Sequence, residues 1–435
     1  QDNGSSTETI ALLGASPAVD AGDNPDGLTE DQRGEARTIG AGTDIGAVEV
    51  LDAIVVDTLE DSVDGDFTEG DRSLREALLS VADGGTITFA NSISDGSIIL
   101  NGSELVIDRA VTIDGTTQNI TLDANGGSRV VRIDDGNFSN AIAVSLSDLT
   151  FTGGSTNGTG GGILNRESLV LSNSTITGNS TESGGGGLSN DFQATADISA
   201  STFSNNTAGF DGGGIANGYG ATLNLTSSTV SGNTAGSDGG GIESEGATTT
   251  LSNSTVFGNS AGDEWGGIIN AYSQTTLTNT TLAGNTASTA GGGFFNSAYL
   301  VTGTYSNSAI ITSTIVANNT APAGADIATP NATGITLTVT NSLVESADGN
   351  GLVNGTDNNI VGLDPLFDVN GLQNNGGSTE TLALLPTSAA IDAGSNPDGL
   401  AQDQTGADRT LGAGTDIGAV EGAVDTPLEI VVDTL

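Results

Sequence analysis

The chain has 435 residues, 66 of them glycine, and carries a formal net charge of −45 with no histidine, cysteine or methionine. Its nine basic residues are all arginines, and none falls between Glu167 and Asp408. This balance excludes a nucleic-acid-binding surface, and it disfavours acidic polysaccharide or anionic lipid as partners without a bridging cation. The lack of cysteine excludes disulfides and thiolate metal sites, and no apolar run is long enough to span a membrane.

The two ends of the chain carry copies of one segment, residues 1–49 and 373–421. Asp20–Leu28 matches Asp392–Leu400 with one substitution, and Asp44–Glu49 is identical to Asp416–Glu421. A later phrase that begins at Ile54 returns at Ile430, which implies a period of about 376 residues. We therefore expect either a window on a longer tandem array or a chain whose duplicated ends join copies head to tail.

Acidic residues gather in three loops. The first contains Asp61, Asp64, Asp66, Glu69 and Asp71, the second contains Asp20, Asp23, Asp26 and Asp31, and the third is the copy with Asp392, Asp398 and Asp403. Hard oxygen ligands at near-alternate spacing suit a flexible Ca²⁺ site. The alternative is a solvated acidic loop, and the sequence leaves both possibilities open.

A single helix is predicted near the start, over residues 73–82. Ser73 followed by Glu76 is a capping-box pattern, and Leu74, Ala77 and Leu78 share one face. This segment resembles the CSLREA-type domain at the start of bacterial β-helix repeats, with Arg72 where that family has its cysteine. Such a helix would cover the open end of a stack of coils.

Short strands follow, first irregularly and then in a regular repeat between about Gly160 and Thr320. A phrase such as Leu171–Asn179 recurs six times at a spacing of about 26 residues, with glycine clusters between the copies. Stacking the copies aligns like residues in columns, the clearest being asparagines, and predicts one parallel strand per coil. The members of four predicted columns are Ile176, Phe203, Val230, Val256, Leu282 and Ile315; Thr175, Thr202, Thr229, Thr255, Thr281 and Thr314; Asn179, Asn206, Asn233, Asn259, Asn285 and Asn319; and Ile163, Leu188, Ile215, Ile242, Ile268 and Phe294.

The alternation of Gly-Gly-Gly-Ile with phrases such as Phe203-Ser-Asn-Asn206 resembles the repeats of the polymorphic outer-membrane family and of pectin-lyase-like β-helices. The stretch from Asn359 through Ala389–Gly394 to Glu421 resembles the choice-of-anchor Q domain that closes β-helices of secreted bacterial proteins. These resemblances imply a right-handed parallel β-helix, an all-β solenoid, with a short N-terminal capping helix. The expected parts are the end of a preceding unit (1–53), a unit start with the helix and irregular coils (54–145), regular coils (146–321), a closing segment (322–421) and the first strand of a next unit (422–435).

The coils offer few groups for catalysis. Lyases of this fold need a lysine or arginine base, which the regular coils lack, and hydrolases need clustered aspartates. Acids at one phase of the repeat, Asp211, Asp238 and Asp263-Glu264, could in principle form a carboxylate pair, although a solvated, cation-binding edge is the commoner arrangement. Trp265 replaces a glycine, and Tyr219 and Tyr272 follow neighbouring glycine clusters. These residues could form a contact patch for sugar or for a neighbouring fibre, or they could simply cover turns.

We therefore expect no enzymatic activity, no catalytic residue and a mechanical role. The predicted function is a repeat unit of a long extracellular fibre or cell-surface adhesin, with Ca²⁺ as the cofactor and further copies of itself as end-to-end partners. Matrix or cell-surface polysaccharide is a further possible partner, whereas nucleic acid and membrane insertion are not expected. The alternatives are a carbohydrate-active β-helix enzyme, either a polysaccharide lyase or a hydrolase, and an autotransporter-type passenger adhesin.

Overall fold

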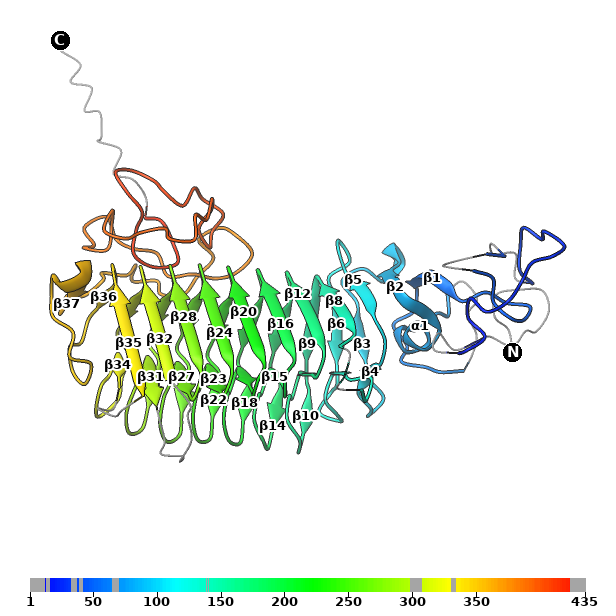
Figure 1. Cartoon of the computed structure of the whole chain (residues 1–435), viewed down its shortest axis with the longest axis horizontal. Coiled ribbons are helices and arrows are strands. Elements are labelled where there is room, and N and C mark those ends of the chain that lie inside the picture. The colour runs from blue at the N-terminus through cyan, green and yellow to red at the C-terminus, as the bar shows by residue number, and fades with distance from the viewer. Residues whose placement is uncertain are drawn as a thin grey trace, which may run out of the picture.

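The computed structural model describes residues 12, 16–32, 37–38, 42–64, 70–137, 139, 141–297, 307–329 and 334–422. These residues form a parallel β-helix, as predicted, in which each coil contributes one short strand to each of several sheets that run along the axis (Figure 1). The chain visits the sheets in a fixed order, for example β12 (Ser168–Ser172), β13 (Thr175–Thr177), β14 (Ser180–Thr181) and β15 (Leu188–Asn190) before it returns to the first sheet.

The first and second sheets each have 11 strands. The first contains β1 (Leu51–Val56), β2 (Val81–Phe89), β5 (Val111–Asp114), β8 (Ala143–Ser147), β12, β16 (Thr195–Ser199), β20 (Thr222–Thr226), β24 (Thr248–Ser252), β28 (Gln274–Thr278), β32 (Asn307–Thr312) and β35 (Ile335–Thr340). The second contains β3 (Ser97–Ile99), β6 (Ile120–Asp123), β9 (Leu149–Thr152), β13, β17 (Thr202–Ser204), β21 (Thr229–Ser231), β25 (Thr255–Phe257), β29 (Thr281–Ala283), β33 (Ile315–Ala317), β36 (Leu343–Val344) and β37 (Ile360–Val361).

The third sheet has 9 strands and the fourth has 6. The third contains β4 (Leu105–Ile107), β7 (Val131–Ile133), β11 (Ile163–Asn165), β15, β19 (Ile215–Asn217), β23 (Ile242–Glu245), β27 (Ile268–Ala271), β31 (Phe294–Ser297) and β34 (Ile327–Ala328). The fourth contains β10 (Ser155–Thr156), β14, β18 (Thr207–Ala208), β22 (Thr234–Ala235), β26 (Ser260–Ala261) and β30 (Thr286–Ala287). Short 3₁₀ turns cover Asn91–Ile93 and Thr356–Asn358.

The predicted inward columns are present, with one error of register. Ile176, Phe203, Val230, Val256 and Leu282 pair in sequence and are fully buried. The next member is Val316 and not Ile315, because Thr281 pairs with Ile315. The prediction for Ile315 and Thr314 was therefore wrong by one residue, and a one-residue shift in a strand moves each side chain to the opposite face.

The asparagine column forms a hydrogen-bonded ladder inside the coil. The side-chain amide of Asn206 donates to Oδ1 of Asn233 at 3.0 Å, and that of Asn233 donates to Oδ1 of Asn259 at 2.9 Å. The same amides also donate to backbone carbonyls, so these buried side chains are satisfied. The left-handed backbone of these turns lies at the residue before each asparagine, for example Asn205 (φ 56°) and Gly232 (φ 64°).

The predicted helix is α1 (Leu74–Ser80), and it closes the apolar interior at the N-terminal end. Ser73 is the N-cap, its Oγ accepts a hydrogen bond from the backbone N–H of Glu76, and the capping box is complete. Leu74 and Leu78 are buried in the continuous core that runs through the coils. The helix ends at Ser80, two residues earlier than expected, because Val81 begins β2.

Residues 366–422 fold back along the outside of the second sheet, so that they lie beside the coils rather than beyond the last one (Figure 1). The outward column of that sheet changes character beneath them, from half-buried Thr175 and Thr202 to fully buried Ile315 and Leu343. Ile315 and Leu343 form a second apolar core with Leu384, Ala390 and Ile417. We call this covered outer face of β21, β25, β29, β33 and β36 the flank. The expected boundaries between parts of the chain remain predictions.

Candidate acidic groove

The most distinctive polar feature of the described coils is an acidic groove of about 350 Å³ on the outer face of the third sheet. Its walls are the turn that enters each strand of this sheet and the turn that leaves it. The groove is lined by Asp211, Asp238, Glu243, Glu245, Asp263, Glu264, Trp265, Ile269, Ala271, Tyr272 and Ser297. The acids predicted to share one phase of the repeat therefore meet in one place, together with two of the three aromatic side chains considered for a sugar-binding patch.

The entering turns place carboxylates of successive coils one above the other. The backbone N–H of Asp238 donates to Oδ1 of Asp211 at 3.1 Å, and the backbone N–H of Glu264 donates to Oδ1 of Asp238 at 3.1 Å. Equivalent atoms of adjacent coils lie about 4.8 Å apart because parallel strands have that spacing. The repeat thus builds a column of acids that neighbouring backbone groups hold in position.

Glu243 is an acid of the groove that the repeat pattern did not reveal. It lies in β23, where its neighbours across the sheet are Ala216 and Ile269, so it is a carboxyl between two apolar side chains of the adjacent coils. Burial raises the pKa of Glu243 well above its usual value, and the charges of Asp211, Glu245 and Asp238 raise it further. This side chain therefore holds its proton under conditions in which an ordinary glutamate is ionised.

The pKa of Asp238 is also raised, but to a moderate value. Burial raises its pKa to about 6, and the charges of Asp211, Glu264 and Asp263 act in the same direction, against the hydrogen bond from Glu264. Burial also raises the pKa of Asp211. The groove therefore combines Glu243, whose raised pKa favours the protonated form, with Asp238, whose pKa is about 6, and acid–base chemistry uses such a pair.

Two aromatic residues border the groove in backbone conformations that favour glycine. Trp265 has φ 65° where the preceding and following coils have Gly239 and Gly291, and Tyr272 has φ 52° at the position of Gly246. Left-handed backbone costs a bulky residue roughly 1–2 kcal/mol. The Trp265 ring packs on Phe295 at a centroid distance of 4.7 Å. The third aromatic residue of the predicted patch, Tyr219, donates from its hydroxyl to Oε1 of Glu245 at 3.0 Å, and Glu245 lines the groove.

The predicted calcium loops have different arrangements. Asp61 is paired with Arg75 and also accepts from the backbone N–H of Asn101, while Asp64 and Asp71 lie nearby in the chain. Asp66 and Glu69 lie outside the described residues. Within the described part of the chain, no group of three or more acidic side chains is arranged to hold a metal ion. Calcium stays a prediction for this loop.

The other two loops use their acids as internal hydrogen-bond acceptors. Asp20 accepts from the backbone of Gly42, Asp31 from Glu49, and Asp403 from Glu421 and Thr405. Asp23 and Asp26 are exposed, as is Asp398, which accepts from Ser252. Asp392 accepts from Ala413 and Gly414. Calcium binding by these loops likewise remains a prediction.

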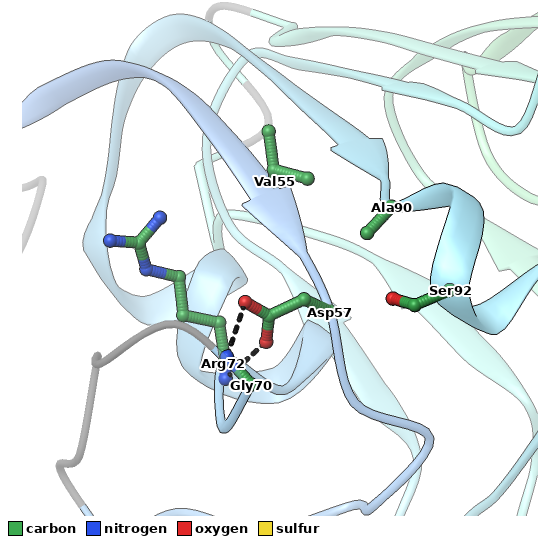
Figure 2. A pocket seen from close by; sticks show the side chains of 6 residues that line it. All are labelled: Val55, Asp57, Gly70, Arg72, Ala90 and Ser92. Carbon is green, nitrogen blue, oxygen red and sulfur yellow. Dashed lines mark hydrogen bonds between the residues drawn. The ribbon is translucent and has the colours of Figure 1, made fainter.

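A second cavity, of about 650 Å³, lies at the N-terminal end between β1 and the turn after β2. Figure 2 shows the Asp57 carboxylate accepting from the backbone of Gly70 and Arg72, while the Arg72 guanidinium extends away from it. Asp57 therefore fastens the loop that leads into α1. The described residues contain no helix long and apolar enough to cross a membrane.

Comparison with known proteins places the fold. No family model and no curated protein sequence matches the chain. Among solved structures, the crystal structure of pectate lyase Pel9A is similar to this chain with a TM-score of 0.51 and 14% sequence identity. The match covers 85% of this chain and 97% of the pectate lyase. The chain is thus a parallel β-helix protein, of the architecture that this lyase shares.

This likeness corrects one expectation. The prediction that the protein is not an enzyme is wrong, because the similar solved structure is an enzyme built on the same β-helix. The prediction rested on the lack of basic residues in the coils, which is an argument against a lyase base alone, and on the interpretation of the clustered acids as a solvated, cation-binding edge. It gave too little weight to a carboxylic acid such as Glu243, which needs no basic neighbour.

Proposed function

We propose that the protein is a carbohydrate-active β-helix that binds a polysaccharide across the third sheet and hydrolyses its glycosidic bonds in the acidic groove. The observation that carries this proposal is that Glu243 and Asp238 line one groove, which Trp265 and Tyr272 border. Burial there raises the pKa of both carboxyls, which supports their roles. The pectate lyase neighbour supports the class of activity through the shared fold.

In the proposed reaction Glu243 is the general acid. Its carboxyl proton passes to the glycosidic oxygen as the bond from that oxygen to the anomeric carbon breaks. A water molecule supplies the new bond at the anomeric carbon, and the ionised Asp238 takes up the proton that the water loses. The products are two shorter saccharides, one with a new reducing end, and proton exchange with solvent restores both carboxyls.

Tyr272, which is half-buried at the edge of the groove, would bind a sugar ring through its phenol face. Trp265 is only 4% exposed and packs on Phe295, so it would support this wall of the groove without contacting the sugar. An aromatic face packs against the C–H face of a pyranose, and such contacts supply much of the contact energy in binding sites. Trp265 and Tyr272 occupy strained positions that glycine fills in neighbouring coils. Strain of this kind persists where a side chain has a use that glycine cannot serve.

The negative charge of the groove determines which polysaccharides it can bind. Five of the lining side chains besides Glu243 are carboxyls, namely Asp211, Asp238, Glu245, Asp263 and Glu264, and no arginine lines the groove. Such a surface repels polyuronates and favours a neutral or amino-sugar polysaccharide. A β-elimination mechanism needs a basic residue to remove a proton, so hydrolysis fits this groove better than lysis. Because polysaccharides of this kind lie outside cells, we infer an extracellular location.

The test is incubation of the purified chain with neutral, amino-sugar and uronate polysaccharides, followed by measurement of new reducing ends and of unsaturated products. We expect reducing ends from a neutral or amino-sugar polymer, and a loss of at least 100-fold in kcat/KM for Glu243→Gln, the usual worth of a general acid. Asp197→Asn is the matched control, because it removes an exposed carboxylate from the first sheet. Equal activity of Glu243→Gln and Asp197→Asn would overturn the assignment, and unsaturated products would replace hydrolysis by lysis.

A further inference from the structure

The two copies of the duplicated segment fold in the same way. In each copy an arginine Nη2 donates to a glycine carbonyl at 2.6 Å, Arg37 to Gly46 and Arg409 to Gly418. In each copy a buried aspartate accepts from a glutamate backbone N–H, Asp31 from Glu49 and Asp403 from Glu421. The described parts of residues 16–50 and 388–422 are therefore two examples of one small folded module.

The C-terminal copy is docked on the flank of the coils. Ile417 is fully buried against Ile315 and Leu343, and the backbone of Ala419 donates to Oγ1 of Thr281 at 3.1 Å. Gly418 donates its backbone N–H to the carbonyl of Ser313 at 2.9 Å. Ile417, Gly418 and Ala419 thus form the apolar and backbone part of a docking face.

Gln404 completes this docking face with polar contacts. Its Nε2 donates to the carbonyl of Ser228 at 3.1 Å and to Oγ1 of Thr229 at 2.9 Å, and its Oε1 accepts from Thr255 at 2.7 Å. The face binds the outward threonines of the coils through hydrogen bonds. It binds the outward Ile315 through apolar contact. It is therefore specific for a flank of this composition.

The N-terminal copy presents the same residues to solvent. Ile45, Gly46 and Ala47 are exposed, and Ile45 is 56% exposed where its counterpart Ile417 is 0% exposed. Gln32, the counterpart of Gln404, keeps the backbone hydrogen bond to Ala47 and has an exposed side chain. Figure 1 shows this copy beyond the α1 end of the coils, far from the flank that residues 366–422 cover. We call Gln32, Ile45, Gly46 and Ala47 the Ile45 face.

We infer that the Ile45 face is a docking surface for the flank of a second copy of this β-helix, seated as residues 388–422 are seated on the first. The occupant is fixed by the internal duplicate, in which the same side chains in the same fold bind that flank. In an intact chain the flank is held by the chain's own closing segment, whose covalent attachment gives it a high effective concentration. Docking between copies therefore requires release of that segment. The module at residues 16–50 of one chain then takes the place of the module at residues 388–422 of another, which is an exchange of like modules between chains.

The experiment frees the flank and tests for association. Ile417→Asp places a charge in the apolar contact, and we expect the average molar mass of the variant in sedimentation to rise with concentration as chains join head to tail. Adding Ile45→Asp to that variant should restore the monomer. Val63→Asp is the matched control, because Val63 is 57% exposed near the same end and is not part of the face. Monomers of Ile417→Asp that stay folded by circular dichroism would overturn the proposal, as would association that survives Ile45→Asp.

A second measurement covers the case in which Ile417→Asp does not fold. Gln404→Ala weakens the closing segment more mildly, and the chain has no cysteine of its own. In that background we expect Ala47→Cys and Thr281→Cys to give an intermolecular disulfide, because Ala419 contacts Thr281 in the docked copy. Ala47→Cys with Thr177→Cys is the control, since Thr177 lies on the same sheet outside the flank. Equal cross-linking of both pairs, or of neither, would contradict the inference.

Discussion

The backbone N–H of Asp238 donates to Oδ1 of Asp211, one coil earlier in the stack, at 3.1 Å. This contact ties the position of one acid to the backbone of the next coil, so the carboxylates of the groove cannot move apart without breaking the stack. Burial raises the pKa values of Asp211 and Asp238, and the neighbouring carboxylates raise that of Asp238 further. Four predictions follow from this groove and from the ladder that supports it.

The pH dependence of hydrolysis should be bell-shaped. The acid-side limb should have a midpoint near pH 6, because Asp238 must be ionised and its pKa is raised to about 6. The alkaline limb marks loss of the proton from Glu243, whose pKa is raised well above the usual value. A kcat/KM profile checks this, and Asp211→Glu should shift the limbs while leaving both present. A profile that stays flat across pH 6 would exclude Asp238 as the base.

Removing the charge of Asp238 should stabilise the fold at high pH. A carboxyl with a raised folded-state pKa gives stability that is full below about pH 4 and is lost as the pH rises through about 6. At pH 8 the unfolding free energy of Asp238→Asn should therefore exceed that of the natural chain by about 1–3 kcal/mol, and its melting temperature should be higher. At pH 4 the two chains should have the same stability. Thermal melts at both pH values check the sign. A destabilised variant at pH 8 would mean that the charge is compensated.

The asparagine ladder should be costly to interrupt. Asn233→Ala removes a fully buried amide and leaves the carbonyl of Phe203 and the backbone N–H of Asn206 without partners. Unsatisfied buried groups cost about 1–3 kcal/mol each, so we expect a loss of about 2–5 kcal/mol. Asn224→Ala is the matched control, because Asn224 lies on the outer face of β20 and should change stability by less than about 0.5 kcal/mol. Urea unfolding measures both.

Tyr272→Gly should separate binding from folding. Tyr272 is half-buried and has φ 52°, which glycine adopts without strain, so the relief of strain offsets the lost packing and the melting temperature should change little. Binding of a soluble oligosaccharide should weaken by at least 10-fold, because a ring-stacking side chain is gone. Isothermal titration calorimetry measures the change. Unaltered affinity in the folded variant would show that Tyr272 only covers its turn.

The sequence predicted the fold in detail in the coils where the same kind of residue recurs at the same spacing. Columns led by Ile176 and by Ile163 could be followed by eye, because each copy keeps the same residue class at the same spacing. The error at Ile315 arose because either Ile310 or Ile311 could start that copy. Ile311 pairs with Leu277, so the copy has the same length as the others, whereas a start at Ile310 moves the alignment by one residue. Only the covering closing segment explains why Ile315 faces outward, and that contact joins residues far apart in the chain.

The groove was half visible in the sequence. Asp211, Asp238 and Glu264 share a phase of the repeat, and Trp265 lies at the next position, so their places in the chain already group them. Glu243 could have been found as the one acid at a position that holds alanine and isoleucine in the adjacent coils. Its function depends on burial and on neighbouring charges, which spacing alone does not give. The calcium loops show the opposite case, since alternate acids in a row gave no indication that Asp61 pairs with Arg75.

The closing segment lies across several coils whose strands are joined along the long axis. Tension applied to the two ends would load these strand pairs one after another, and each coil of about 26 residues would add about 90 Å of contour length when it peels away. The coils beneath residues 366–422 cannot peel until that segment detaches. A pulling trace should therefore show a regular saw-tooth as the uncovered N-terminal coils peel away, and one larger force peak where residues 366–422 detach, which gives the molecule a latch against extension.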